Sequence, residues 1–316
     1  MLDIPTVLTA DEILDKAFRK ASKVDVRRGT RLDTVRQINI SKLKSSSDVI
    51  VSTLGRYVKS FPSIEALSPF YSELIDVTIG TDRLKKSLGA MDWCRGQVAK
   101  VSRAAVRDMS SQNSTARIDE LRRGTYGRIS SLVKQVDGEL KFLAKARSTI
   151  KKFPTIDHEA PTTVIGGAPN VGKSQLVRRM STAKPRVAVY PFTTQEVSVG
   201  VFERARARYQ VIDTPGLLDR PLSERNAIEL RAVLALRHLA DVVVFVIDPS
   251  ETCGYTRGQQ ERLLSSLKTE FRDVPIIEVE NKVDLLDSGS SRMKISAITG
   301  TGVDALVDEV VSALAA

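Results

Sequence analysis

Two spacings of apolar residues divide the chain near its middle. Before about residue 150, apolar positions recur every three or four residues, which is the period of a helix that buries one face. The clearest stripe is formed by Ile129, Leu132, Val133, Val136, Leu140 and Leu143. After about residue 160, short apolar runs alternate with helical segments. The pattern predicts a helical first half and a second half of alternating strands and helices.

Helix-start and helix-stop signals refine the first half. The sequence "TADE" at Thr9–Glu12 has the spacing of a capping box. Ser68 and Pro69 suit the first two positions of a further helix. A break or kink is expected at Pro62, because proline lacks the backbone N–H that a helix interior needs. We predict an all-α helical bundle over residues 1–152.

The second half alternates strand and helix patterns closely enough to define a fold class. Strands are predicted at residues 162–166, 241–248 and 274–280, with a hairpin around 203–205 and a short edge strand at 292–296. Helices are predicted from Lys173 onward and at 223–239, 257–267 and 303–314. Such alternation is typical of an α/β domain, whose mostly parallel sheet carries helices on both faces. We place this domain at 162–316, after a linker at 153–161 that begins where Pro154 would end a helix.

Composition narrows the function classes. With 316 residues, 42% of them hydrophobic, the chain is long enough for two domains with buried cores. Cys94 and Cys253 lie far apart and in no motif, which excludes a disulfide framework and suits a reducing compartment. No signal-peptide pattern is visible, and the longest apolar run, Val242–Ile247, is too short to span a bilayer. We expect a cytoplasmic, monomeric protein without membrane attachment.

Charge is distributed unequally between the two halves. Residues 1–160 carry 29 Lys and Arg residues against 19 Asp and Glu residues, whereas residues 161–316 carry 19 of each. This excess favours a polyanionic partner for the helical half, with a solvated surface as the alternative. Because aromatic residues make up only 5% of the chain, phosphate contacts with folded RNA fit better than base stacking. The candidate contacts are the cations Lys100, Arg103, Arg107, Arg122, Arg123 and Arg128.

A glycine-rich turn follows the first predicted strand. Residues 167–174 have the spacing G-x-x-x-x-G-K-S of a P-loop, in which backbone N–H groups and a helix N-terminus surround phosphate groups. In that pattern Lys173 reaches the outer phosphates and the Ser174 hydroxyl coordinates Mg²⁺. The alternative is a turn that holds no ligand. The residues expected around the nucleotide are Ala168, Pro169, Asn170, Val171, Gly172, Lys173, Ser174 and Gln175.

A second candidate loop, "DTPG", begins at Asp213 and follows the predicted hairpin. Asp213 would hold Mg²⁺ through water, and the N–H of Gly216 would meet the γ-phosphate. The D-x-x-G spacing is common in turns. Its position one hairpin after the P-loop is what favours a nucleotide-binding loop over an ordinary turn.

Two later loops point to the base. A carboxylate at Asp284 in "NKVD" can accept two parallel N–H bonds from guanine, which adenine does not offer. The alternative is a helix-capping asparagine and a solvated Lys–Asp pair. The loop "SAITGTG" would add backbone contacts to the guanine oxygen, or it is an ordinary glycine-rich loop. These loops add Asn281, Lys282, Asp284, Ser296, Ala297 and Ile298 to the site, and the four loops together predict GTP and GDP binding.

These loops resemble those of a known family. The segments "GAPNVGKS", "YPFTT", "DTPGLLDRPLSERNAIE" and "NKVD" resemble the Obg-like GTPases, and most closely the nucleolar GTP-binding protein (NOG) family. Upstream, "RRGTYGRISSLVKQVDGELKFLAKARSTIKKFPTID" resembles the helices that precede the G domain in that family. The resemblance implies a Ras-like G domain and a role in assembly of the large ribosomal subunit. The chain ends at Ala316 without the C-terminal extension of eukaryotic members, so it resembles a short, archaeal form.

The same resemblance implies roles for single residues in hydrolysis. Thr194, in "YPFTT", is expected to ligate Mg²⁺ in the GTP state and to act in catalysis with Lys173 and Gly216. Leu217 stands where many GTPases place a water-orienting glutamine, so slow turnover is expected unless a partner or cation assists. Asn170 is a candidate ligand of K⁺, and a role in stabilising the loop weighs equally.

Three functions compete at this point. The first is a ribosome-assembly GTPase whose basic bundle contacts rRNA and neighbouring ribosomal proteins of the large subunit. The second is a signalling GTPase that is recruited by a protein partner. The third is an RNA-binding placeholder in which hydrolysis is incidental. A smaller question concerns Arg204, Arg206 and Arg208, whose alternation predicts one face of a strand that is either solvated or contacts RNA.

Overall fold

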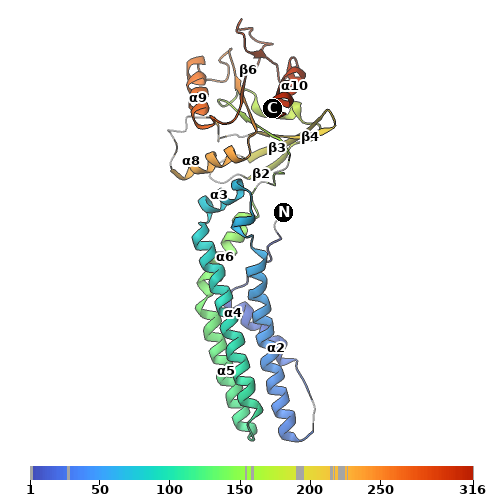
Figure 1. Ribbon diagram of the computed structural model, residues 1–316, viewed down its shortest axis with the longest axis vertical. Helices are drawn as coiled ribbons and strands as arrows, with labels where there is room; N and C mark the ends of the chain where they lie inside the picture. The colour runs from blue at the N-terminus through green and yellow to red at the C-terminus, as the bar shows by residue number, and fades with distance from the viewer. Residues whose placement is uncertain are drawn as a thin grey trace. The chain divides into compact units, whose positions relative to one another are not determined.

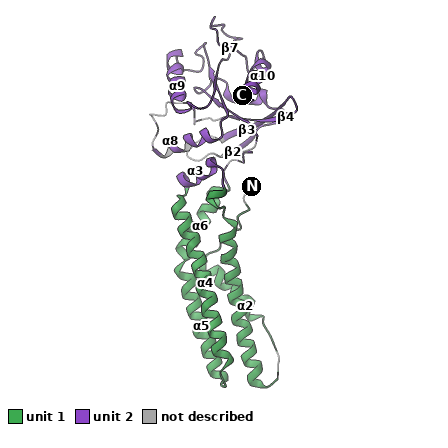
Figure 2. Ribbon diagram, in the orientation of Figure 1, with its two compact units in different colours: residues 1–66, 79–151 green, residues 67–78, 152–316 purple. Residues whose placement is uncertain are grey.

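The chain forms two compact units in the computed structural model (Figure 2). The first comprises residues 1–66 and 79–151, and the second comprises 67–78 and 152–316, so the chain passes between the units three times. The residues described by the structure are 3–26, 29–153, 155–157, 160–189, 196–213, 216, 218–219, 225 and 227–315.

The first unit is all-α, as the apolar stripes predict (Figure 1). Its helices are α1 (Ala10–Ser22), α2 (Arg31–Ser60), α4 (Thr81–Ser110), α5 (Thr115–Gln135) and α6 (Asp137–Ile150), with a 3₁₀ turn η1 (Ile64–Ala66). The predicted capping box is confirmed, since the N–H of Glu12 donates to the Thr9 hydroxyl and the Glu12 carboxylate accepts from the N–H of Thr9. The break expected at Pro62 is also confirmed, because α2 ends at Ser60.

The stripe that starts at Ile129 belongs to two helices rather than one. Helix α5 ends at Gln135 and α6 begins at Asp137, with Val136 between them at φ −99° and ψ 10°. Gly138 follows at once, and glycine is among the poorest helix formers. Since Val133, Val136 and Leu140 are all buried, the apolar period continues across the break and hides it from the sequence.

The second unit is an α/β domain built on a seven-stranded sheet in the order β2-β3-β4-β1-β5-β6-β7. Its strands are β1 (Thr162–Gly166), β2 (Arg186–Val189), β3 (Glu196–Arg204), β4 (Ala207–Asp213), β5 (Val242–Ile247), β6 (Ile276–Glu280) and β7 (Met293–Lys294). Its helices are α3 (Pro69–Thr78), α7 (Lys173–Met180), α8 (Ala227–Leu234), η3 (Ala235–His238), α9 (Arg257–Glu270) and α10 (Val303–Leu314). Pairing is parallel from β4 through β1, β5 and β6 to β7, and antiparallel in β2-β3-β4. The predicted fold class is thus confirmed, with helices on both faces of the sheet (Figure 1).

The arginine-rich hairpin departs from the prediction. Arg206 lies in the turn at φ 65°, not in a strand. Arg208 pairs across the ladder with Glu203, whereas Arg204 pairs with Ala207, so Arg204 and Arg208 lie on opposite faces of the sheet. The guanidinium group of Arg204 binds the Asp308 carboxylate on α10 through two hydrogen bonds of 2.8 and 2.9 Å. The three side chains therefore do not share one face.

Helix α3 groups with the second unit, although the sequence division placed it in the bundle. The reason is its apolar face, where Phe70 and Leu74 are fully buried in the core of the α/β domain. On its polar side, Glu73 and Asp76 accept hydrogen bonds from Arg231 of α8 at 3.1 and 2.7 Å.

The segment predicted as a linker also packs within the second unit. Ile156 is 5% exposed, and its N–H donates to the Tyr71 hydroxyl at 3.3 Å. Gln210 of β4 bonds to both the N–H and the carbonyl of Asp157. Within the described ranges, no helix combines the length and apolar character needed to cross a membrane.

Candidate nucleotide-binding site

The turn between β1 and α7 requires its two motif glycines. Gly167 has φ +140°, and a Cβ there would lie 2.4 Å from the carbonyl oxygen of Val246. Gly172 has φ +100°, and a Cβ there would lie 2.3 Å from Nδ2 of Asn281. Because a side chain would collide with β5 at Gly167 or with Asn281 at Gly172, only glycine lets the turn take this backbone conformation.

Lys173 begins α7 and is held inside this turn. Its Nζ donates hydrogen bonds of 2.8 Å to the carbonyl oxygens of Gly167 and Ala168. Burial lowers the pKa of its ammonium group, while the negative charges of Asp213 and Asp219 act in the opposite direction. The buried ammonium group lies where an anion would add favourable Coulomb energy.

The turn encloses a cavity of about 390 Å³. The residues lining it are Pro169, Asn170, Gly172, Lys173, Ser174, Gln175 and Asp219. Of the other predicted residues of this loop, Ala168 and Val171 are buried beneath it. Asn170 has a left-handed backbone at φ 60°, which asparagine tolerates better than most residues. That conformation accounts for Asn170 without an ion, so the K⁺ assignment stays a prediction.

The second loop lies beside the first because β4 pairs with β1. Asp213 ends β4 opposite Ile165 and is 1% exposed. The N–H of Gly167 donates to the carbonyl of Leu218 at 3.1 Å, which ties the two loops together. The N–H of Gly216 donates to Oδ2 of Asp219 at 3.0 Å. The amide expected to meet a γ-phosphate is thus occupied by a carboxylate.

Arg225 also holds this second loop through contacts with Gly216 and Asp219. Its guanidinium group donates to the carbonyl of Gly216 at 3.1 Å and lies 3.5 Å from the Asp219 carboxylate. The Arg225 side chain is 3% exposed and that of Asp219 is 17% exposed. Thr194 and Leu217 fall outside the residues that the structure describes.

Asn281 joins the phosphate loop to the predicted guanine loops. Its Nδ2 donates to the carbonyl of Val171 at 2.8 Å, and its Oδ1 accepts from the N–H of Ala297 at 2.9 Å. The side chain is 2% exposed, so both bonds are shielded from water. The structure therefore brings the phosphate loop together with two loops that follow it by more than a hundred residues in the chain.

Lys282 is paired with a carboxylate that the sequence analysis did not single out. Its Nζ donates to Asp248 at 2.6 Å and to the Thr252 hydroxyl at 2.8 Å. Burial opposes ionisation of Asp248, but hydrogen bonds from Lys282, Ser250 and the Cys253 N–H outweigh it and hold the pKa below its ordinary value. Its position could have indicated a site residue, because Asp248 directly follows the buried strand β5.

The remaining base-side residues surround an open surface. Asp284 is exposed, as expected for a carboxylate that must be accessible to a nucleotide base. Ser296 is buried, and its hydroxyl accepts from the N–H of Thr299 at 3.1 Å. Ile298 is 64% exposed, while its carbonyl accepts from Arg179 at 3.0 Å. Asp219 was also missed from the sequence, since an aspartate three residues after a D-x-x-G glycine has no distinctive spacing.

The residues present fit a magnesium nucleotide. Ser174 and Asp213 supply oxygen ligands of the kind Mg²⁺ prefers, and Lys173 supplies a cation for phosphate. Among the described residues, no group of three or more His, Cys, Asp or Glu side chains could hold a metal alone. A site with few protein ligands is typical of Mg²⁺ that is bound mainly through substrate phosphates.

Fold and site together define a G domain of the GTPase class, preceded in the chain by a helical unit. Family models match the NOG1 N-terminal helical domain over residues 2–157 and nucleolar GTP-binding protein 1 (NOG1) over residues 227–284. The chain belongs to the nucleolar GTP-binding protein 1 family.

Individual relatives give the extent of the match. An uncharacterized archaeal protein of Methanocaldococcus jannaschii is 38% identical over 90% of this chain and 81% of its own length. Nucleolar GTP-binding protein 1 of Drosophila melanogaster is 35% identical over 87% of this chain but only 42% of its own length. The crystal structure of a nucleolar GTP-binding protein 1 from Plasmodium falciparum is 34% identical, with a TM-score of 0.47 over 51% of this chain and 90% of that chain. The chain thus spans less than half of the Drosophila relative and most of the archaeal one.

Proposed function

We propose that this protein is a GTP-binding assembly factor of the large ribosomal subunit, which hydrolyses GTP slowly and contacts rRNA through its basic helical unit. The observation that carries the proposal is that the nucleotide loops and the excess positive charge lie in different halves of the chain. The predicted nucleotide loops lie in residues 161–316, where acidic and basic side chains balance, whereas the positive excess lies in residues 1–160. The nucleotide state would determine how long the basic unit stays on its RNA.

Binding would draw on groups that already surround the cavity. Backbone N–H groups at the start of α7 and the Lys173 ammonium group would stabilise the phosphates. The ammonium group would exchange its bonds to the Gly167 and Ala168 carbonyls for bonds to phosphate oxygens. When bound, Mg²⁺ would supply positive charge to the terminal phosphates. Asp284 would accept hydrogen bonds from guanine.

Slow hydrolysis follows from the residue after Gly216. Leu217 has no polar group that could orient an attacking water molecule, so turnover would depend on a partner or a cation. Replacing sodium with potassium in the assay buffer separates the alternatives for Asn170. Equal turnover in both buffers would assign Asn170 to loop geometry alone.

The deciding experiment combines sedimentation with altered base specificity. Wild-type protein should co-sediment with large ribosomal subunits differently in a non-hydrolysable GTP analogue and in GDP, and the association should weaken steeply with salt. The Asp284→Asn variant should lose this response to guanine nucleotides and regain it with the xanthine analogue, because the amide suits the altered base.

Three outcomes would contradict the proposal. Sedimentation that is insensitive to salt would favour the protein-recruited signalling GTPase. Release on schedule by Ser174→Asn or Thr194→Ala variants would favour the placeholder, in which hydrolysis is incidental. Retained guanine preference in Asp284→Asn would remove the assignment of the base.

A further inference from the structure

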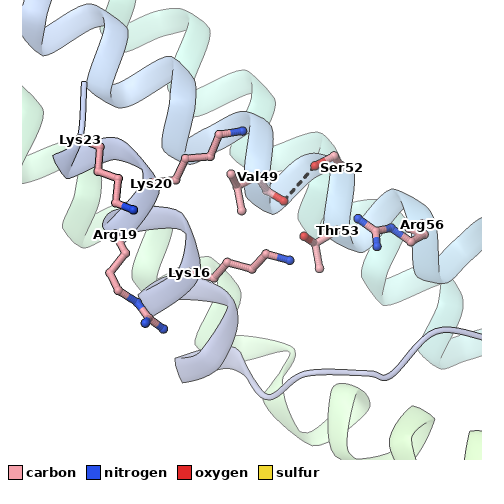
Figure 3. A pocket seen from close by; sticks show the side chains of 8 residues that line it. All are labelled: Lys16, Arg19, Lys20, Lys23, Val49, Ser52, Thr53 and Arg56. Carbon is pink, nitrogen blue, oxygen red and sulfur yellow. Dashed lines mark hydrogen bonds between the residues drawn. The ribbon is translucent and has the colours of Figure 1, made fainter. Parts of the chain in front are cut away.

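A groove between α1 and α2 gathers positive charge in the helical unit, and its lining shares no residue with the nucleotide cavity. The cavity measures about 570 Å³, and its lining residues are Lys16, Arg19, Lys20, Lys23, Val49, Ser52, Thr53 and Arg56. Five of these eight side chains are cationic, and none is acidic. Lys16 and Lys20 extend from α1 toward α2, where Arg56 lies near Thr53 (Figure 3).

The packing of α1 fixes this arrangement. Its apolar side, which includes Ile13, Leu14 and Ala17, is buried, so the basic residues at i, i+3, i+4 and i+7 from Lys16 are held on a different side. The start of the helix is anchored by the N–H of Ala10, which donates to the Asp137 carboxylate of α6 at 2.9 Å. The backbone positions from which these cations extend are therefore fixed by the packing of α1.

Most of these cations have no internal counter-ion. Among the described residues, no ion pair or side-chain hydrogen bond engages Lys16, Lys20, Lys23 or Arg56. Arg19 is the exception, since it pairs with Asp15 at the exposed rim. Converging like charges repel each other, and a polyanion removes that cost.

Two other basic clefts of the helical unit contain acidic side chains as well as basic ones. The cleft around Arg103 and Arg107, which the sequence singled out, also contains Asp48. The cleft around Arg117 and Arg128 contains Asp108 and Glu120. The α1–α2 groove is the one of these three whose lining carries no carboxylate. Its sequence signal was present in the spacing of Lys16, Arg19, Lys20 and Lys23.

We infer that the α1–α2 groove binds the phosphate backbone of a folded RNA. The seven-residue step from Lys16 to Lys23, the C-cap of α1, spans roughly 10 Å, so the cations can contact more than one phosphate group. The Ser52 hydroxyl donates to the Val49 carbonyl at 3.1 Å and can accept a hydrogen bond from a ribose hydroxyl. The Thr53 hydroxyl on the groove wall can donate to a phosphate oxygen. No aromatic side chain lines the groove, which favours backbone contacts over base stacking.

This inference rests on the proposed RNA contact of the helical unit, and its test separates the two. The triple variant Lys16→Gln, Lys20→Gln, Arg56→Gln removes three charges from the groove and leaves a polar side chain at each position. A matched control, Lys184→Gln, Arg262→Gln, Arg272→Gln, removes three exposed charges from the second unit. The measurement is affinity for an RNA duplex of about 16 base pairs, between about 50 and 200 mM salt. Helical circular dichroism of both full-length variants checks that they are folded.

The groove variant should bind the duplex at least roughly tenfold more weakly, and its slope of log affinity against log salt should fall by about two to three. The control should bind within about twofold of wild type, because it leaves every cation of the groove in place. Equal losses in both variants, or no loss in the groove variant, would overturn the inference. Preference of the wild type for phosphatidylserine vesicles over the duplex would also overturn it, in favour of a lipid surface.

Sedimentation with large subunits keeps the two proposals apart. If wild type and groove variant sediment equally, the groove is not the contact, while the proposed function stands. If wild type binds the duplex through the groove but does not associate with subunits, the groove stands and the proposed function fails.

Discussion

Asn281 is the residue on which the nucleotide loops most depend. The motif "NKVD" was enough to predict that Asn281 belongs to a nucleotide loop, because the four residues of the motif are consecutive in the sequence. Its bonds to Val171 and Ala297 could not be predicted, since they join segments that only the sheet brings together. The same limit applies to Asp219, whose bond to the Gly216 N–H is visible only in the folded loop.

Replacing Asn281 should therefore destabilise the G domain as well as weaken nucleotide binding. In Asn281→Ala, the carbonyl of Val171 and the N–H of Ala297 lose their partner in a buried setting, which costs about 2–4 kcal/mol. Chemical unfolding and nucleotide titration would measure the two effects. Asn113→Ala, at an exposed position in the helical unit, serves as the control. Unchanged stability in Asn281→Ala would show that the two bonds are dispensable.

Asp219 should act as a competitor of the γ-phosphate. Its carboxylate occupies the N–H of Gly216 and lines the cavity near Lys173. In Asp219→Ala, the amide is free and a negative charge is gone, so affinity should rise for a GTP analogue more than for GDP. The change in their ratio should be several-fold, about 1 kcal/mol. An unchanged ratio would mean that the carboxylate moves away at no cost.

At the scale of helices and strands, the sequence predicted most elements because their apolar periods are long and regular. The sequence prediction failed where a regular spacing of residues continues through a turn and so does not reveal it. The stripe around Val136 continues through the break between α5 and α6, and the alternation Arg204–Arg208 continues through a hairpin turn. Strand β2 was not predicted, since four residues with one arginine give too short a pattern.

The ends of β5 and the loop after β6 are joined by the Asp248–Lys282 ion pair, which makes acid stability a test of that junction. The folded pKa of Asp248 lies below its ordinary value of 3.8. Its contribution is therefore fully present above about pH 4 and is lost as the pH falls through the folded pKa. Asp248→Asn should cost about 1.5–3 kcal/mol at pH 7 and flatten the acid limb of the stability curve. An acid limb as steep as that of wild type would assign it to other carboxylates.

At the scale of the whole molecule, the two apolar patterns predicted the fold classes, but not the membership of α3. Its sequence is helical and lies among helices, so nothing local assigns it to the α/β core. Only the burial of Phe70 and Leu74 in that core does so.

Truncating Phe70 should affect the G domain and not the bundle that surrounds it in sequence. Phe70 is fully buried, and Phe70→Ala should cost about 3–5 kcal/mol. Hydrogen exchange should accelerate at amides of β5 while those of α2 keep their protection. Leu43→Ala, buried in α2, should give the reverse pattern. Faster exchange in α2 for Phe70→Ala would place α3 with the bundle after all.

The three passages of the chain between its units bear on the making of hybrids from relatives. Joining the first 152 residues of one parent to the remainder of another gives the G domain a foreign α3, whose side chains evolved against a different core. The exchangeable part is residues 67–78 together with 152–316, and no single crossover point delivers both. Recombination within this family should therefore succeed with two grafts from the same parent and fail with one.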